Sequence, residues 1–438
     1  MSKSALRGLR RTALLTAALI VPGGEAQAQP KAPPGPTAPG VEEVVAMALD
    51  RSPALAARRA RVAAARELEK PAAVFFDPML EAMLQNAGAI EYTVGKEEMS
   101  MIGVEARQGL LYPGKRRAAG EVARAETALR EAELAALERQ VAAEIRRTYA
   151  RLYALDRERQ ALQAARELVE MLSATAAVRY SAGEVDQEAL IKAQLEVLCL
   201  GELLDDLAAK RAAMVAEINR WLDRPGDAPL DSVATLPPVA VEPQPWAASA
   251  IAGSAEIAVG RAAVEVGARR VRAAELELRP NLSAAAGLGS RGGMDPIVTL
   301  RFGLELPFWQ RQKQEPMVRA TRQELTMAEQ ELRDAEAMVR AEAARIAAEW
   351  ETAERQIVRY RDAIVPRTSV AFDAARASYL AGRGDFSTVI EDFELWLEAR
   401  VQLSRREADR FAAWADLRRL TDAAVANPAQ EAPEGEPQ

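Results

Sequence analysis

The sequence predicts a mainly α-helical protein with a small β part, built from two similar halves. Residues 121–180 contain neither glycine nor proline, so one helix can run through all 60 of them. Two pairs of short segments with alternating polar and apolar residues, at about 79–111 and 281–308, predict strands. The segment YSAGEVDQEALIKAQ from Tyr180 has a counterpart in YLAGRGDFSTVIEDF from Tyr379, which indicates an internal duplication.

The helices are expected to form long packed hairpins that project into water. At 1.5 Å per residue, a helix over 121–180 would extend roughly 90 Å, which is too long for a compact globule. In the second half, apolar residues recur at gaps of three and four with one slip, as in a coiled-coil seam. This seam comprises Leu325, Ala328, Leu332, Ala335, Val339, Ala343, Ile346, Trp350, Ala353, Ile357, Tyr360 and Ile364.

The repeated segments are interpreted as the turns of these hairpins. Gly183 and Gly382 can adopt the left-handed conformation that ends a helix without steric cost. An aspartate three residues later, Asp186 or Asp385, can cap the returning helix. Any pair of antiparallel helices can close in this way, so the pattern alone assigns no function.

The last predicted strand has two chemically different faces. One face would carry Val298, Leu300, Phe302, Leu304 and Leu306, and the other Thr299, Arg301, Gly303 and Glu305. This alternation suits a membrane barrel with lipid outside and water inside, and it equally suits a strand of a soluble sandwich. The export signal described next, together with the duplication, favours the barrel.

The chain is predicted to be exported and to contain two repeats. A basic start, a short apolar run over 12–21 and the cleavage pattern Ala26-Gln27-Ala28 make residues 1–28 a signal peptide. A proline-rich linker (29–40) leads to the first repeat (41–222), and a second linker (223–246) leads to the second repeat (247–421). Each repeat would have one short amphipathic helix, two strands and a hairpin, with tips at about 181–186 and 380–385. The acidic tail, 422–438, is expected to be disordered, and no stretch after the signal approaches 18 consecutive apolar residues.

Composition excludes several classes of function. The net charge of −7 gives no electrostatic footprint for nucleic acid. Histidine is absent and Cys199 is the only cysteine, which removes histidine acid–base chemistry, His/Cys zinc sites and an intrachain disulfide. No nucleophile lies beside a base in any recognisable motif. We therefore expect no enzyme, no metal site and no cofactor.

Three other features are given structural interpretations. Residues 287–292 match G-x-G-x-x-G, but a second strand follows them instead of a helix, so a loop between barrel strands is expected. Cys199, beside Leu198 and Leu200, is expected to be an inert buried thiol. The basic cluster Lys115-Arg116-Arg117 is expected to face water, lipid headgroups or a neighbouring protomer.

From residue 41 to residue 421, the chain resembles the TolC-like outer membrane efflux proteins of Gram-negative bacteria. The resemblance rests on several motifs that occur in this order: ALDRSPAL, LLYPGKRRAAGEVARAE, the tip pattern RYSAGEVDQEALIKAQLE, LELPFWQRQ, and the second copy of the tip pattern, SYLAGRGDFSTVIEDFE. It implies a homotrimer in which each protomer gives four strands to a twelve-stranded transmembrane β-barrel, continued by an α-helical barrel through the periplasm. The segment LLYPGKRR is similar to the metal-cation branch of the family.

The resemblance also implies partners and site residues. The trimer would be the passive outer membrane exit duct of a tripartite pump, supplied by an inner-membrane transporter, of the RND type, through a periplasmic adaptor. The tips that would contact the adaptor are Gly183, Glu184, Val185 and Asp186, and Gly382, Arg383, Gly384 and Asp385. The family often has acidic residues after the second tip; Thr388 departs from this pattern, and Glu391, then Asp392, are the expected gate carboxylates. The alternative interpretation is that Glu391 and Asp392 lie on an ordinary solvated face of a helix.

Two other functions remain open at this stage. A periplasmic adaptor is also exported and helical, but it usually has one hairpin and a membrane anchor. An exported coiled-coil scaffold without a pore would leave the strand pairs unexplained. The substrate, whether metal cation, drug or protein, is not encoded in any motif.

Overall fold

The computed structural model describes residues 39–183, 187–239 and 245–421, which all belong to one unit. Within these residues the protein is mostly helical with one small sheet, as predicted. The predicted signal peptide, most of the first linker, and the acidic tail lie outside the described residues.

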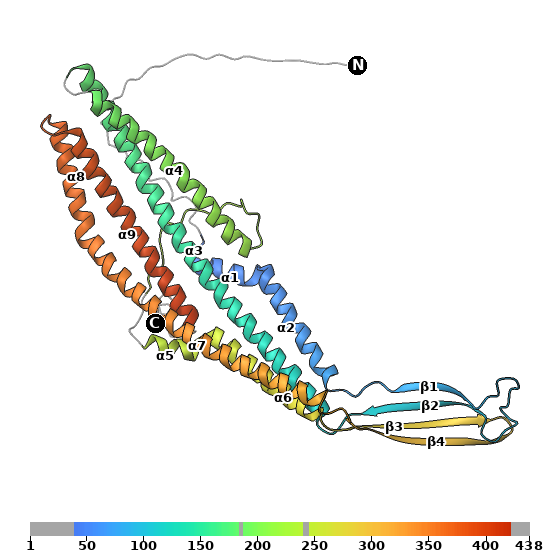
Figure 1. Ribbon diagram of the computed structural model, residues 1–438. Helices are drawn as coiled ribbons and strands as arrows, with labels where there is room; N and C mark the ends of the chain where they lie inside the picture. Colours follow the sequence, from blue (N-terminus) through green and yellow to red (C-terminus); the bar gives the residue numbers. More distant parts are fainter. Residues whose placement is uncertain (1–38, 184–186, 240–244, 422–438) are drawn as a thin grey trace, which may run out of the picture. The chain divides into compact units, whose positions relative to one another are not determined.

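The same order of elements occurs twice (Figure 1). The first half contains α1 (Val41–Arg51), α2 (Pro53–Ala72), β1 (Met79–Gln85), β2 (Met101–Leu110), α3 (Lys115–Ser181) and α4 (Gln187–Trp221). The second contains α5 (Trp246–Gly253), α6 (Ala255–Leu276), β3 (Asn281–Arg291), β4 (Met294–Glu305), α7 (Gln314–Arg359), the π-helix η1 (Tyr360–Ile364), α8 (Val365–Leu380) and α9 (Phe386–Thr421).

Each half opens with two helices, which corrects the expectation of one. The first break falls at Ser52, because Pro53 has no N–H group to continue the hydrogen-bond ladder and is instead favoured in a first turn. The second break falls at Ser254, whose side chain accepts a hydrogen bond from the Ile257 backbone N–H and so caps α6.

The four strands form one antiparallel sheet in the order β1-β2-β3-β4. The halves meet in its centre, where Leu110 of β2 pairs with Leu282 of β3. Residues 287–291 lie inside β3, so the expected loop over 287–292 is wrong except at its end. The chain turns at Gly292 and Gly293, and Gly292 has a φ of 73°, which a side chain would strain.

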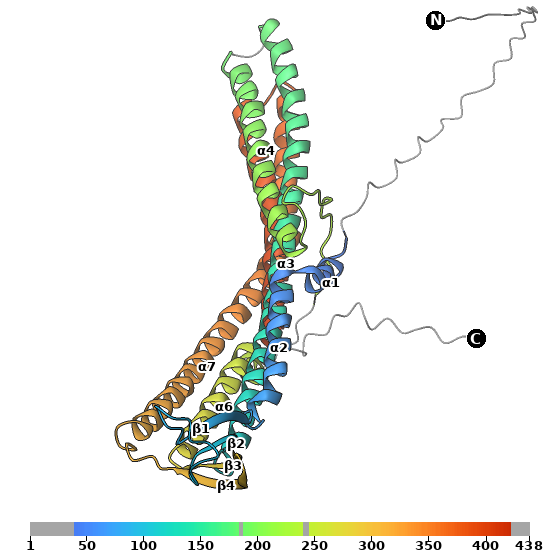
Figure 2. The same ribbon diagram turned by 90° about the vertical axis from the view of Figure 1, so that its right-hand side faces the viewer.

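The helical part is organised around α3, whose 67 residues would extend about 100 Å at 1.5 Å per residue. Helix α3 packs against α4, α6 and α9 (Figure 2). The predicted seam of α7 is buried at most of its positions, namely Ala328, Val339, Ala343, Ile346, Trp350, Ala353 and Ile357. Because α3 starts just after β2, the sheet lies at one end of α3 and the first hairpin turn at the other.

The second hairpin is not a continuous α-helix on its way to the turn. The π-helix η1 separates α7 from α8 at the end of the predicted seam. Pro366 lies just beyond it and cannot donate to the carbonyl of Asp362, which is the physical reason for the irregularity. Within η1, Arg361 contacts Glu407 of α9 at 2.9 Å.

The segment between the halves is packed against the helices in its described part, residues 223–239. Leu230 and Val233 are buried in the main hydrophobic cluster. The buried carboxylate of Asp156 in α3 accepts hydrogen bonds from Arg211 Nε at 2.8 Å and from the Val233 backbone N–H at 2.9 Å. This carboxylate joins α3, α4 and the connecting segment at a single point.

Candidate functional site

All four strands present apolar side chains on one face of the sheet. The sequence indicated this pattern for β4, and the register of the sheet extends it to the other three strands. The large exposed side chains of this face are Leu80, Leu84, Ile102, Val104, Leu282, Leu288, Val298, Leu300, Phe302 and Leu304. Phe302 is 85% exposed and Leu300 is 67% exposed. Such a contiguous exposed apolar surface indicates contact with an apolar partner.

The opposite face carries charged groups that bridge the strands. Arg107 of β2 contacts Glu81 of β1 at 3.5 Å and Glu105 of its own strand at 3.3 Å. Arg301 of β4 contacts the other oxygen of Glu105 at 2.8 Å. The Glu105 side chain is only 2% exposed, because it lies between the two guanidinium groups.

A glycine makes the contact from β2 to β4 possible. Gly287 of β3 pairs with Glu105, and a Cβ atom on Gly287 would lie 3.4 Å from the Cβ of Glu105. The absence of a side chain there lets the carboxylate reach across β3 to Arg301. Neighbouring positions of this face, including Gly103, Ala285 and Gly289, are also small. The face is therefore charged, and the side chains of Glu105 and Met101 lie against Gly287 and Gly289.

The basic cluster after β2 lies in three different environments, which corrects the expectation for Lys115. The side chain of Lys115 is 3% exposed, and its Nζ contacts Glu277 Oε2 at 3.0 Å and Asn281 Oδ1 at 2.9 Å. The guanidinium of Arg116 lies 3.5 Å from the centre of the Phe75 ring. Only Arg117 projects into solvent. Lys115 thus fixes the start of α3 to the start of β3.

Both hairpin glycines adopt the predicted left-handed conformation. The φ angle is 73° at Gly183 and 71° at Gly382. Glu184, Val185 and Asp186 lie outside the described residues. Arg383, Gly384 and Asp385 are exposed, and Asp385 is the residue immediately before α9.

The two hairpin ends are joined by contacts that the sequence did not indicate. Arg179 Nη1 of α3 donates to the Tyr379 carbonyl at 2.9 Å, and its guanidinium lies over the Tyr379 ring. Lys192 of α4 contacts Ser387 of α9 at 3.1 Å. The hydrogen bond to Glu188 raises the pKa of Lys192, and the charges of Asp385 and Glu391 add to this effect. The two tips therefore share one polar surface.

The two expected gate carboxylates are neighbours in sequence, and Glu391 lines a groove between helices. This groove, of about 920 Å³, is bounded by α3, α4 and α9. Its acidic lining residues are Glu158, Glu196, Glu391, Glu394 and Glu398. Partial burial raises the pKa of Glu196, and the charge of Glu394 raises it further. In the described ranges, no group of three acidic, cysteine or histidine side chains is arranged to hold a metal ion.

Cys199 also lines this groove and is exposed, so the expectation of a buried thiol is wrong. Helix α4 buries Ala193, Leu200 and Leu207, at intervals of seven residues. Cys199 precedes Leu200 by one position and is therefore rotated by about 100° away from the buried stripe. Its apolar neighbours suggested burial, but Leu195 and Leu198 are exposed as well.

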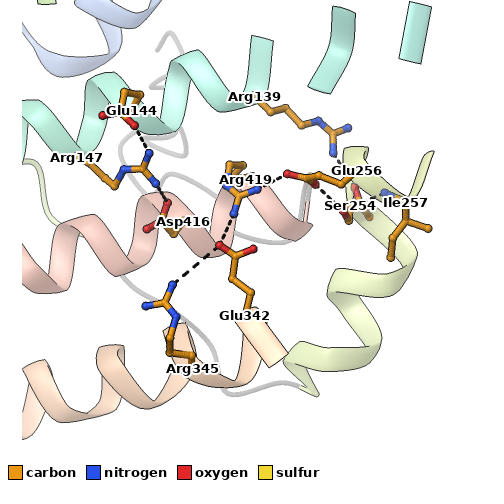
Figure 3. A network of polar contacts seen from close by, with 11 residues as sticks. Arg139, Glu144, Arg147, Ser254, Glu256, Ile257, Glu342, Arg345, Asp416 and Arg419 are labelled. Carbon is orange, nitrogen blue, oxygen red and sulfur yellow. Dashed lines mark hydrogen bonds and ion pairs between the residues drawn. The ribbon is translucent and has the colours of Figure 1, made fainter. Parts of the chain in front are cut away.

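A network of ion pairs holds the helices together away from the tips (Figure 3). Arg419 of α9 contacts Glu256 in the first turn of α6, and it contacts Glu342 of α7 at 2.7 Å. Glu256 accepts a hydrogen bond from the Ser254 hydroxyl at 2.6 Å, and Arg139 of α3 donates to the Gly253 carbonyl at 2.7 Å. The break between α5 and α6 is therefore tied to three long helices.

The same network includes a second arginine on α3. Arg147 contacts Asp416 of α9 and Glu144 of its own helix (Figure 3). Desolvation raises the pKa of Asp416, and the positive charges of Arg147 and Arg419 oppose this increase. The network has no free nucleophile or base, and its geometry is that of a clamp between helices.

Comparison with known proteins supports the fold. No family model matches the chain, and no curated protein matches it in sequence. Among solved structures, it is similar to the outer membrane protein VceC from Vibrio cholerae, with a TM-score of 0.75 and 17% identity over 88% of this chain and 96% of VceC. It is also similar to the CmeC outer membrane channel of Campylobacter jejuni, with a TM-score of 0.69 and 14% identity over 88% of this chain and 86% of CmeC.

A third similar structure is the open state of the MtrE outer membrane channel of Neisseria gonorrhoeae, with a TM-score of 0.66 and 14% identity over 89% of this chain and 91% of MtrE. Within the described residues, no helix combines the length and the apolar character needed to cross a bilayer. The TolC-like fold implied by the order and duplication of the motifs is confirmed, and the chain has the fold of the bacterial outer membrane efflux channels.

Proposed function

We propose that this chain is one subunit of a homotrimeric outer membrane channel, the exit duct of a tripartite efflux system. The observation that carries the proposal is the two-faced sheet. Its apolar face, exposed on all four strands, suits contact with lipid, and its charged face, lined with small residues, suits a water-filled interior. The likeness to outer membrane channels over nearly nine-tenths of the chain supports this function.

The sheet also supports assembly into a closed barrel. In the part of the chain described, the outer edges of β1 and β4 pair with no other strand. Unpaired edges do not occur in lipid, because each unsatisfied N–H or C=O group is costly there. Pairing β4 of one copy with β1 of the next, three times round an axis, would give twelve strands and leave no free edge.

The remaining parts of the chain have roles in this proposal. The α-helices would continue the duct through the periplasm of a Gram-negative bacterium, and the hairpin tips would contact a periplasmic adaptor. An inner-membrane pump, which we place in the RND type, would supply metal cations or drugs through that adaptor. The duct itself would perform no catalysis. Glu391 would provide the gate carboxylate, with Asp392 beside it, because a threefold ring of carboxylates favours cations.

The conductance of the purified full-length mature chain in planar bilayers tests both the duct and the gate. We expect stable cation-selective channels, and we expect the double variant Glu391→Gln/Asp392→Asn to lose cation selectivity and block by multivalent cations. The matched control is Glu349→Gln/Glu351→Gln, which removes the same charge from an exposed part of α7. Channels that are indifferent to the gate substitutions would refute the gate assignment. A folded protein that forms no channels would refute the duct.

A further inference from the structure

The chain leaves β4 through a segment whose chemistry changes in order. Residues 306–313 read LPFWQRQK, so apolar and aromatic residues come first and cations follow. Phe308 is 82% exposed and Trp309 is 71% exposed. The last residue of the apolar row within β4 is Leu304, and the exposed Leu306 continues the row beyond the strand. Phe308 and Trp309 follow shortly after it. The apolar surface of the sheet therefore extends past the end of the strand.

Other exposed aromatic side chains lie at the same edge of the sheet. Glu305 pairs with Asn281, the first residue of β3, so the end of β4 lies beside the start of β3. Phe75 and Phe76 precede β1 at this edge and are 46% and 62% exposed. Aromatic side chains at strand ends are typical of the boundary between the apolar core of a bilayer and water.

The two cations of the segment are available to a ligand. Arg311 and Lys313 are exposed, and neither forms an ion pair with the described part of the chain. Lys115 and Arg117 differ in this respect, since Lys115 is paired with Glu277 and Arg117 with Glu121. Aliphatic and aromatic groups followed by free cations match the order of acyl chain, interface and phosphate in a lipid monolayer.

We propose that residues 306–313 bind phospholipid headgroups at the helical end of the sheet and prefer anionic headgroups such as phosphatidylglycerol. Phe308 and Trp309 lie at the boundary of the acyl chains, and Arg311 and Lys313 contact the lipid phosphates. The inference rests on the proposed function, because it requires the apolar face of the sheet to lie in lipid. It adds a defined lipid partner and fixes where the membrane ends on this chain.

Quenching of tryptophan fluorescence by brominated lipids tests this inference on the full-length mature chain. Trp309 is the tryptophan beside the sheet; the others are Trp221, Trp246, Trp350, Trp396 and Trp414, all in helices. The protein is reconstituted in phosphatidylcholine vesicles that contain equal fractions of either brominated phosphatidylcholine or brominated phosphatidylglycerol. At low salt, two cations at about 1 kcal/mol each should enrich the anionic lipid roughly thirtyfold near Trp309, and brominated phosphatidylglycerol should therefore quench more strongly.

Matched variants distinguish the effect of the two cations from the effect of the position of Trp309 in the membrane. Trp309→Phe should abolish the quenching. Arg311→Gln/Lys313→Gln should make the two brominated lipids equivalent. Arg333→Gln/Arg340→Gln, which removes the same charge about 30–40 Å along α7, should leave the preference intact. Salt of about 0.5 M should weaken the preference in the unmodified chain.

The outcomes distinguish this inference from the proposed function. Equal quenching by both lipids in the unmodified chain would overturn the preference for anionic headgroups. Flotation of the protein with vesicles without quenching of Trp309 would overturn the interfacial position while keeping the membrane location. A folded chain that neither floats with vesicles nor is quenched would refute the proposed function itself.

Discussion

Placing an arginine in the middle of the apolar sheet face would show whether that face meets lipid. Leu300 lies near the centre of β4, and about two-thirds of its surface is exposed in the single chain. In water, Leu300→Arg would lose the apolar burial of about a third of a leucine side chain, on the order of 0.5–1 kcal/mol. In a bilayer, an arginine near the midplane of a barrel strand costs roughly 2–4 kcal/mol.

The matched control is Thr299→Arg, which adds the same charge one residue away on the opposite face. We expect this variant to be nearly neutral, since the charged face already holds Arg301 and Arg107 in contact with Glu105. The assay is folding into phospholipid vesicles followed by urea titration, with folded protein detected by its shifted electrophoretic mobility without boiling. If Leu300→Arg destabilised the protein no more than Thr299→Arg, the apolar face would not lie in lipid.

Three further predictions concern the helical part. Asp156→Ala should lower the free energy of unfolding by about 3 kcal/mol, because it leaves the buried N–H of Val233 and an arginine without their acceptor; a change below about 1 kcal/mol in a urea titration would contradict this. Burial and the like charge of Glu394 raise the pKa of Glu196, so its ionised form destabilises the fold and stability is lost as pH rises through that pKa. Glu196→Gln should therefore become more stable relative to wild type as the pH rises from about 4 to about 8. A difference in stability that does not depend on pH would refute the effect. Gly382→Ala should cost about 1–2 kcal/mol because its φ is 71°, whereas Gly201→Ala, inside α4 with open space around it, should stabilise by about 0.5–1 kcal/mol; melting temperatures that shift in the same direction would rule this out.

Local patterns in the sequence were sufficient to predict much of the fold. The alternation of polar and apolar residues begins at Met79 and Met101, and β1 and β2 begin there as well. The left-handed turns at Gly183 and Gly382 and the buried seam of α7 follow from residue type and spacing. In each case the determining residues are close in sequence, so periodicity and backbone preference are enough to predict the structure.

The features that the sequence did not reveal depend on partners far along the chain. Lys115 was expected to face water, lipid headgroups or a neighbouring protomer because it follows the first strand pair, but Glu277 and Asn281 cover it from the second half. The contact of Arg179 with Tyr379 also joins the two halves. No periodicity within either segment carries this information, because it depends on how two hairpins pack against each other.

The candidate site was accessible to sequence analysis only in part. The role of Glu391 stays a prediction from the family resemblance, and its proximity to Glu196 follows from the common packing of α4 and α9 on α3. The ion pair between Glu105 and Arg301 could not be predicted, because it depends on the register of three strands and on the absence of a side chain at Gly287. Glycine in a strand indicates close approach, but it does not identify the group that approaches.

The central pairing of β2 with β3 has a consequence for the order in which the protein can form. The hairpin of α3 and α4 joins segments that follow one another in the chain, but Leu110 cannot pair before Leu282 has been synthesised. Until then β1 and β2 are a two-stranded ribbon, which is marginal in water, with an open edge and an exposed row of apolar side chains. Because these partners are far apart in sequence, closure of the long loop between β2 and β3 is expected to limit the rate at which the sheet forms.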